Sequence, residues 1–191
     1  MPAQRIWFAD MGDFWVFGYG SLMWRPGFAH VETRKARLSG YRRALCIRSH
    51  VHRGTPDRPG LVLGLDRGGS CLGLAFRVPA ELTDEVMAYL RERELVTNVY
   101  LERKVRVRFE TGETVDAVTY VADRTHFQYA RSMDAEDAAR TVTGAMGQSG
   151  PNEEYVLNTL EHLNALGIRD RWLENVAARL NPSREHQRRG P

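Results

Sequence analysis

Near its N-terminus the chain reads Phe14-Trp15-Val16-Phe17-Gly18-Tyr19-Gly20-Ser21-Leu22-Met23-Trp24, an aromatic and apolar run that changes abruptly into Gly-Tyr-Gly-Ser. A short apolar run bounded by turn residues is typical of a buried strand, which we expect over residues 14–19. The glycines permit positive φ angles and a close approach of the backbone. N–H groups at such a turn lack partners in the sheet, so they are available to an anion or a polarised carbonyl. On spacing alone, an ordinary strand and tight turn is the simpler interpretation.

The composition is that of an ordinary globular protein. The chain has 191 residues, of which 42% are hydrophobic and 27% charged, so it is long enough to bury one sizeable core. We expect a single domain over residues 14–180, a lead-in over residues 1–13 and a basic tail over residues 181–191. No apolar run approaches the ~20 residues of a membrane span, and the N-terminus lacks the long apolar region of a signal peptide. We therefore expect no membrane association.

The cysteine content bears on the cellular compartment, and the charge content bears on the kinds of binding partner. Two cysteines, Cys46 and Cys71, make no disulfide framework and favour a reducing cytoplasm. The formal net charge of +3 permits a nucleic-acid partner, but the arginines are interspersed with acids and no platform of aromatic and basic residues accompanies them. We therefore expect no nucleic-acid binding. An excess of arginine also suits an acidic small-molecule substrate, because a guanidinium holds a carboxylate through two hydrogen bonds.

Strand signals dominate the first two thirds of the chain, and helix signals dominate the last third. Apolar alternation predicts strands over residues 14–19, 32–39, 42–48, 61–65, 70–78, 99–109 and 114–121. Turn residues near Gly40 and at 66–69 predict that the strands on either side are joined by tight turns, as in a hairpin. Helical periodicity predicts helices over residues 83–96, 132–146, 152–166 and 170–180. Strands followed by helices indicate an α+β domain with a mostly antiparallel or mixed sheet.

One acidic residue of the first predicted helix lies on its apolar stripe. Val86, Leu90 and Glu94 are spaced at i, i+4 and i+8, so they share one face of the helix. Acids are rarely buried unless they are paired or functional. The structural interpretation is a salt bridge to an arginine or a frayed helix end. The functional one is a general acid or base whose pKa is raised in a dry pocket.

Other patterns of catalytic residues fit less well. The spacing of Cys46, His50 and His52 matches no standard structural metal site, so we expect no metal. Ser21 lacks the Gly-x-Ser-x-Gly surroundings of a hydrolase nucleophile. The glycines of the first turn lack the third glycine of a dinucleotide-binding fingerprint. The turn before the helix at 152 reads as mainly architectural, although Tyr155 in its first turn is a candidate to line a site.

Several separated segments together resemble one family, the ChaC-type γ-glutamylcyclotransferases. They are residues 15–28, 52–65, 69–78, the Arg-Glu-Leu-Val helix end at 93–96 with Tyr100, and residues 147–155 followed by 166–170. Each motif is modest alone, but they occur in the family's order and span residues 14–175. The resemblance implies a γ-glutamylcyclotransferase-like fold, a small mixed β-barrel flanked by helices. It also implies an enzyme that cyclises the γ-glutamyl group of glutathione, releases 5-oxoproline and Cys-Gly, and needs no cofactor or metal.

The resemblance also assigns residues to the reaction. The family's catalytic carboxylate falls on Glu94, and its substrate-binding loop falls on Val16, Phe17, Gly18, Tyr19, Gly20, Ser21 and Leu22. Glu94 would take a proton from the substrate's ammonium group and give it to the departing cysteinyl nitrogen. Arg48, His52 and Arg53 are candidates to meet the Cys-Gly carboxylate. Asn98 stands where related sequences usually carry glycine, and asparagine is the next most tolerant residue for a left-handed turn.

Three alternative functions remain open at this point. The first is a cyclotransferase for other γ-glutamyl peptides or amines. The second is a non-enzymatic regulator of cation transport, a role attached by name to the ChaC family, which predicts a membrane-protein partner. The third is a nucleic-acid binder, which the positive charge alone suggests. Protein partners are not indicated by any motif.

Overall fold

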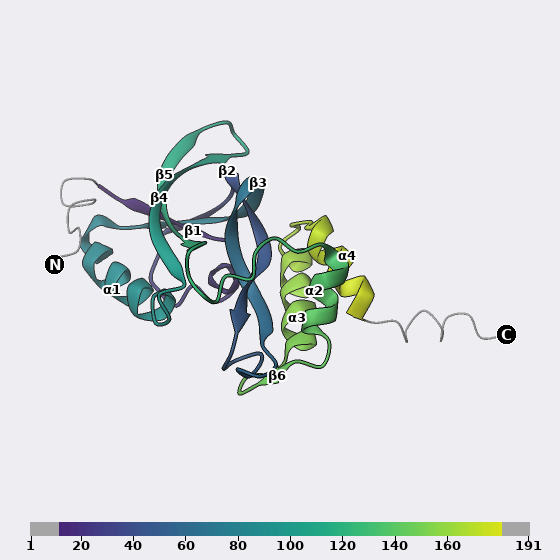
Figure 1. Ribbon diagram of the computed structural model, residues 1–191. Coiled ribbons are helices and arrows are strands. Elements are labelled where there is room, and N and C mark those ends of the chain that lie inside the picture. The colour runs from purple at the N-terminus through teal and green to yellow at the C-terminus, as the bar shows by residue number, and fades with distance from the viewer. Residues whose placement is uncertain (1–11, 181–191) are drawn as a thin grey trace. The chain divides into compact units, whose positions relative to one another are not determined.

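The computed structural model describes residues 12–180, which fall into two compact units (Figure 1). The first unit comprises the described residues up to Arg42 together with Arg67–Val121. The second comprises Arg43–Asp66 together with the described residues from Ala122 onward. Two long strands, β2 (Glu32–Ser49) and β3 (Gly60–Val78), contribute residues to both units. The expected lead-in and tail lie outside the described residues, except for Gly12 and Asp13.

The strands close into a barrel in the order β1-β3-β2-β4-β5. In addition to the two long strands, it contains β1 (Phe14–Gly18), β4 (Tyr100–Phe109) and β5 (Thr114–Ala122). β1 pairs antiparallel with β3, where Phe14 lies opposite Val78. It pairs parallel with β5, where Val16 lies opposite Val118. This mixed barrel, together with the helices, confirms the predicted α+β class and the barrel implied by the resemblance.

The apolar stripe of α1 (Thr83–Glu94) packs into the core of the first unit. Val86 is 2% exposed and Leu90 is fully buried, and burying a side chain of this size contributes about 1.5–3 kcal/mol. A short 3₁₀ turn, η2 (Ala80–Leu82), leads into the helix. The same core cluster contains side chains from β1, β3, β5 and the 3₁₀ turn η1 (Ser21–Met23), namely Phe14, Val16, Leu22, Val78, Val118 and Tyr120. This core therefore packs α1 and the turn after β1 against one another.

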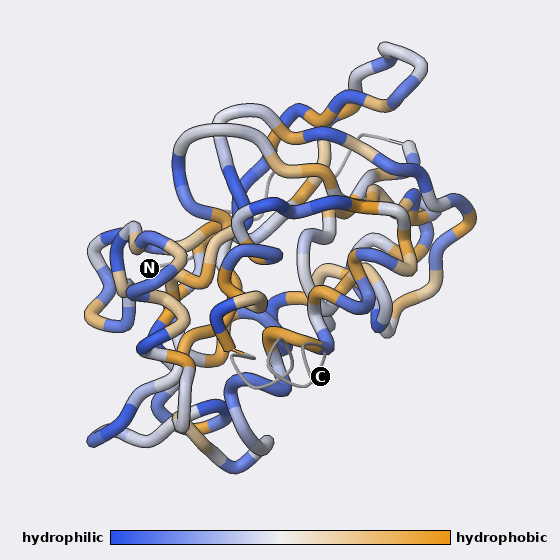
Figure 2. The backbone as a smooth tube through the Cα atoms, turned by 90° about the vertical axis from the view of Figure 1, so that its right-hand side faces the viewer, coloured by the Kyte–Doolittle hydropathy of each residue, from blue (hydrophilic) through white to orange (hydrophobic). Residues whose placement is uncertain are grey.

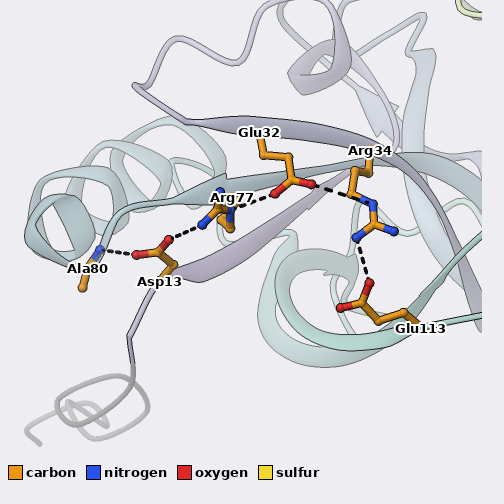
Figure 3. Close-up of polar contacts among 6 residues, drawn as sticks. All are labelled: Asp13, Glu32, Arg34, Arg77, Ala80 and Glu113. Carbon is orange, nitrogen blue, oxygen red and sulfur yellow. Dashed lines mark hydrogen bonds and ion pairs between the residues drawn. The ribbon is translucent and has the colours of Figure 1, made fainter. Parts of the chain in front are cut away.

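A chain of ion pairs joins strands of the first unit through Asp13, Arg77, Glu32, Arg34 and Glu113 (Figure 3). Arg77 is central, because its guanidinium lies 2.7 Å from Asp13 Oδ2 and 2.9 Å from Glu32 Oε2. Arg34 continues the chain to Glu113, also at 2.9 Å. Single exposed ion pairs contribute little to stability. Together, these ion pairs link the start of β1, β2, β3 and the β4–β5 turn.

The described residues of the second unit form three helices and a short two-stranded sheet, in addition to their parts of the barrel strands. The helices are α2 (Ala135–Val142), α3 (Asn152–Ala165) and α4 (Arg171–Leu180), and the sheet pairs β6 (Met146–Gly147) with β7 (Gly150–Pro151). α4 packs against both α2 and α3, and the three lie side by side in Figure 1. A buried ion pair, with 2.9 Å between Arg43 Nη1 and Asp170 Oδ2, links β2 to the loop before α4.

Where the sequence predicts tight turns, the structure has continuous strands. β2 runs through Gly40 without reversing, and β3 runs through residues 66–69. Gly40, Gly68 and Gly69 all have positive φ angles. A glycine in this conformation can bend or bulge a strand without reversing it, so the two predicted turns are wrong for a local conformational reason. α2 is also shorter than predicted and ends at Val142, just before Gly144 at φ 70°.

Apolar and polar stretches alternate along the chain (Figure 2). This is the pattern of strands and helices that each bury one face. Among residues 12–180, no helix has the length and apolar character needed to cross a membrane.

Candidate functional site

Glu94 is the last residue of α1 and continues its buried stripe. Val86 and Leu90 precede it on the same face, as the spacing predicts. The side chain of Glu94 is only 18% exposed. The helix stops directly after it, two residues earlier than expected, with the Leu95 N–H donating to the carbonyl of Arg91. The carboxyl group is therefore held at the end of the helix with its aliphatic stem in the core.

Two opposing effects act on the pKa of Glu94. Burial raises it above the ordinary value, and the positive charge of Arg93 lowers it by a smaller amount. The contact behind the second effect is an ion pair with 3.2 Å between Arg93 Nε and Glu94 Oε1. The ion pair of the structural interpretation is present, and the raised pKa is compatible with the functional interpretation, which stays a prediction. A carboxyl group in this state can exchange a proton nearer to neutral pH than an exposed one.

The turn after α1 keeps the backbone geometry expected of it. Asn98 has φ 55°, in the left-handed region. Its N–H donates to the carbonyl of Leu95 at 3.1 Å. The substitution of asparagine for glycine is therefore accommodated, and the chain turns from the end of α1 into β4 as predicted.

The turn after β1 presents backbone N–H groups. η1 is closed by the Met23 N–H donating to the Gly20 carbonyl at 2.9 Å and by the Arg25 N–H donating to the Ser21 carbonyl at 2.8 Å. Within residues 12–180, the N–H groups of Gly20, Ser21 and Leu22 have no hydrogen-bond acceptor. They can therefore donate to an anion or a carbonyl oxygen.

The strand part of the predicted loop is packed into the protein. Val16 and Phe17 are fully buried, and Tyr19 is 8% exposed. The carbonyl of Phe17 accepts a hydrogen bond from the hydroxyl of Thr119 at 2.9 Å. A Cβ atom at Gly18 would lie 3.1 Å from the Cβ of Leu22, so a larger residue there would disturb the turn. Of residues 16–22, Ser21 is the exposed one.

Arg93 joins this turn to Glu94, and the sequence analysis did not single it out. Its Nη2 donates to Ser21 Oγ at 3.0 Å, while its Nε lies on the Glu94 carboxylate. The structure thus brings together two of the predicted site elements, Glu94 and the Ser21 turn, through one guanidinium. In the sequence, Arg93 belongs to the Arg-Glu-Leu-Val helix end at 93–96, but nothing there gives the arginine a role of its own.

A hollow of about 620 Å³ adjoins Arg93 and is lined by Arg25, Gly27, Tyr89, Glu92 and Arg93. Gly27 has φ 73°, and a Cβ atom there would collide with the hydroxyl of Tyr89. That hydroxyl accepts a hydrogen bond from Arg93 Nη1 at 3.0 Å. Close packing at Gly27 therefore helps to fix the guanidinium.

A buried phenol interacts electrostatically with Glu94. Tyr120 is 1% exposed, and its hydroxyl donates to Glu102 Oε2 at 3.3 Å. Glu102 is also held by Arg91 through two hydrogen bonds of 2.8 and 2.9 Å. Burial raises the pKa of Tyr120, and the negative charges of Glu102 and Glu94 raise it further. Tyr120 therefore stays a neutral hydrogen-bond donor over the physiological range.

The remaining predicted site residues, Tyr155 and Arg48, belong to the second unit. The hydroxyl of Tyr155 accepts a hydrogen bond from the Leu63 N–H at 3.1 Å, and the Arg53 guanidinium lies 5.5 Å from its ring centre. The Arg48 backbone exchanges two hydrogen bonds with Gln128. Their roles as substrate contacts stay predictions. Within the described part of the chain, no group of three acidic, histidine or cysteine side chains is placed to hold a metal ion.

Comparisons with known proteins give a consistent result. The family model described as ChaC-like protein matches residues 14–182. A protein of Escherichia coli (strain K12) named glutathione-specific gamma-glutamylcyclotransferase is 35% identical over 167 residues, which cover 87% of this chain and 72% of that one. A protein of the same name from Schizosaccharomyces pombe is 34% identical over 176 residues, covering 81% and 85%. The crystal structure of a yeast γ-glutamylcyclotransferase specific to glutathione superposes with a TM-score of 0.79 at 22% identity, covering 92% of this chain and 99% of that one, so it shows the same fold.

Proposed function

Since the chain belongs to the ChaC-like protein family, we propose that it is a γ-glutamylcyclotransferase that cleaves glutathione to 5-oxoproline and Cys-Gly. The names of the Escherichia coli and Schizosaccharomyces pombe relatives support glutathione as the substrate. The structural observation that carries the proposal is Glu94, a largely buried carboxyl group whose pKa is raised by burial, beside a turn with available N–H groups.

In the proposed reaction the substrate attacks itself. The α-amine nitrogen of the γ-glutamyl group forms a bond to the γ-carbonyl carbon, and the amide bond to the cysteinyl nitrogen breaks. The amine is mostly protonated at neutral pH, so a base must first remove a proton. Glu94 takes that proton and then donates it to the leaving nitrogen, so one group serves both steps. The second proton, which the attacking nitrogen loses as the lactam forms, passes to the amine of the released Cys-Gly. A single residue with both roles works best when its pKa is raised toward the working pH, which is the direction that burial gives Glu94.

The turn after β1 is proposed to hold the γ-glutamyl group. The N–H groups of Gly20, Ser21 and Leu22 would donate to its carboxylate or to the oxyanion that develops on the attacked carbonyl. One such donor contributes roughly 3 kcal/mol to transition-state stabilisation. Residues 16–19 would then form the wall behind the turn. Holding the glutamyl chain bent also brings the amine and the carbonyl together, which lowers the entropic part of the activation barrier.

Two further parts of the proposal concern the contacts of the protein with the Cys-Gly portion of glutathione and the cellular compartment. Arg48, His52 and Arg53 are proposed as candidates to meet the Cys-Gly carboxylate, and Tyr155 is proposed as a residue that lines a substrate site. The proposed location is the cytoplasm, because Cys46 and Cys71 are buried thiols and such thiols suit a reducing compartment.

The test is a product assay with the purified protein. We expect glutathione to yield 5-oxoproline and Cys-Gly in equal amounts, and γ-glutamyl-alanine to react much more slowly. Faster turnover of γ-glutamyl-alanine would instead indicate a cyclotransferase for other γ-glutamyl compounds. Absence of 5-oxoproline from every γ-glutamyl substrate would overturn the enzymatic proposal and favour the non-enzymatic alternative.

A further inference from the structure

All three nitrogens of the Arg93 guanidinium are engaged by the protein. Nη2 donates to Ser21 Oγ at 3.0 Å, and Nε lies 3.2 Å from Glu94 Oε1. Nη1 donates to the carbonyl of Arg25 at 2.6 Å and to the Tyr89 hydroxyl at 3.0 Å, with a longer contact of 3.3 Å to the Pro26 carbonyl. The side chain is 23% exposed. A guanidinium offers its five N–H groups in one rigid plane, so these contacts fix where the side chain lies.

These contacts tie the turn after β1 to the end of α1. Ser21 and Arg25 are separated from Arg93 by 72 and 68 positions in the sequence. Two of the acceptors are main-chain carbonyls that directly follow η1, so Arg93 holds the backbone of the turn as well as a side chain. A lysine in this place has no planar fork and cannot make the same set of hydrogen bonds.

The positive charge of Arg93 also acts on the carboxyl group of Glu94. Its charge opposes the effect of burial on the pKa of that carboxyl. Tyr120 on β5 also interacts electrostatically with Glu94, and its hydroxyl donates to Glu102. Arg93 therefore supplies the positive charge that acts on Glu94, while Tyr120 stays neutral.

We propose that Arg93 is a positioning residue, which fixes the Ser21 turn and the Glu94 carboxylate at one distance from each other. The substrate must meet both groups at once, so the position of the guanidinium sets the geometry for proton transfer. This inference rests on the proposed function. It adds to that function a residue that acts through the Ser21 turn and the Glu94 carboxylate.

The experiment compares Arg93→Lys, Arg93→Gln and Glu94→Gln with the unaltered chain. Arg106→Gln is the matched control, because Arg106 is 73% exposed and pairs with a single carboxylate on Asp116. Glutathione turnover is followed by 5-oxoproline release across pH 5–9, and thermal unfolding is recorded for each protein. Displacement of reacting groups by about 1 Å can cost about 100-fold in rate, so we expect kcat to fall by about that factor in both Arg93 variants.

The pH profile separates positioning from folding. In Arg93→Gln the positive charge is lost, so the pKa of Glu94 rises and the acidic limb of kcat/KM moves to higher pH. In Arg93→Lys the charge remains, so the limb stays near its original place while kcat still falls. A purely structural role would lower the melting temperature and leave the limb where it was in both variants.

The outcomes distinguish this inference from the proposed function. If the unaltered chain releases 5-oxoproline, Glu94→Gln does not, and both Arg93 variants behave like Arg106→Gln, the positioning role is refuted and the function stands. If Arg93→Gln does not fold, Arg93→Lys alone decides: a fall in kcat at an unchanged melting temperature supports the positioning role, and an unchanged kcat refutes it. If the unaltered chain has no cyclotransferase activity, both proposals fall together.

Discussion

Replacing Asn152 by alanine provides a sharp test of how the second unit is held together. The side chain is fully buried at the start of α3. Its Oδ1 accepts from the Leu61 N–H at 2.6 Å, and its Nδ2 donates to the Leu61 carbonyl at 2.8 Å. Alanine removes both bonds and leaves two main-chain groups of a fully buried residue without partners. Each such group costs about 1–3 kcal/mol, so we expect a loss of about 2–6 kcal/mol in the free energy of unfolding.

Urea unfolding followed by circular dichroism measures this loss. Asn158→Ala is the matched control, because Asn158 lies on the same helix and is exposed. Its effect should stay within about 0.5 kcal/mol. Asn152→Asp should also destabilise strongly, since it removes the Nδ2 donor and buries a charge. A loss below about 1 kcal/mol for Asn152→Ala would refute the argument, because it would mean that Leu61 finds other partners at little cost.

Three further predictions concern the first unit. Burial raises the pKa of Glu94, so the folded chain binds the carboxyl proton more tightly than the unfolded chain. Proton binding to Glu94 therefore stabilises the folded state. This stabilisation is complete below the ordinary pKa of about 4.3 and is lost as the pH rises through the folded-state pKa. Glu94→Gln should therefore melt at a higher temperature than the unaltered chain at pH 8, with a smaller difference at pH 4; an equal difference at both pH values would contradict this. Tyr120→Phe removes the hydrogen bond to Glu102 and should lower the unfolding free energy by about 1.5–3 kcal/mol in urea titrations, and no measurable loss would argue against that bond. Gly27→Ala should lower both the melting temperature and the rate of 5-oxoproline release, because its Cβ displaces the Tyr89 hydroxyl from Arg93; Gly112→Ala, at φ 90° with open space around it, controls for backbone strain, and equal activity of the two variants would count against the role of Tyr89.

The sequence predicts well those parts of the fold whose signals are local. The apolar run from Phe14 becomes β1, and the spacing of Val86, Leu90 and Glu94 places the acid on the buried face of α1. Asn98 takes the left-handed turn that its residue type permits. In each case the short-range pattern and the tertiary structure require the same conformation.

Features that depend on contacts between residues far apart in the sequence cannot be predicted from local sequence patterns. A glycine with positive φ is compatible with a reversing turn and with a bent strand, and Gly40 and residues 66–69 take the second form because β2 and β3 continue in the barrel. Arg93 is inconspicuous for the same reason. Its significance comes from Ser21 and Arg25, some 70 positions earlier, and helical periodicity carries no information about such contacts.

The central claim is that Glu94 transfers the proton in the cleavage of glutathione. It is tested most directly by the rate of 5-oxoproline release from glutathione by Glu94→Gln, beside Glu85→Gln, which alters an exposed acid on the same helix. General acid and base catalysis contributes about 100- to 10,000-fold, so Glu94→Gln should fold and lose at least about 100-fold in kcat, while Glu85→Gln keeps its activity. A Glu94→Gln protein that releases 5-oxoproline at the unaltered rate would contradict the account.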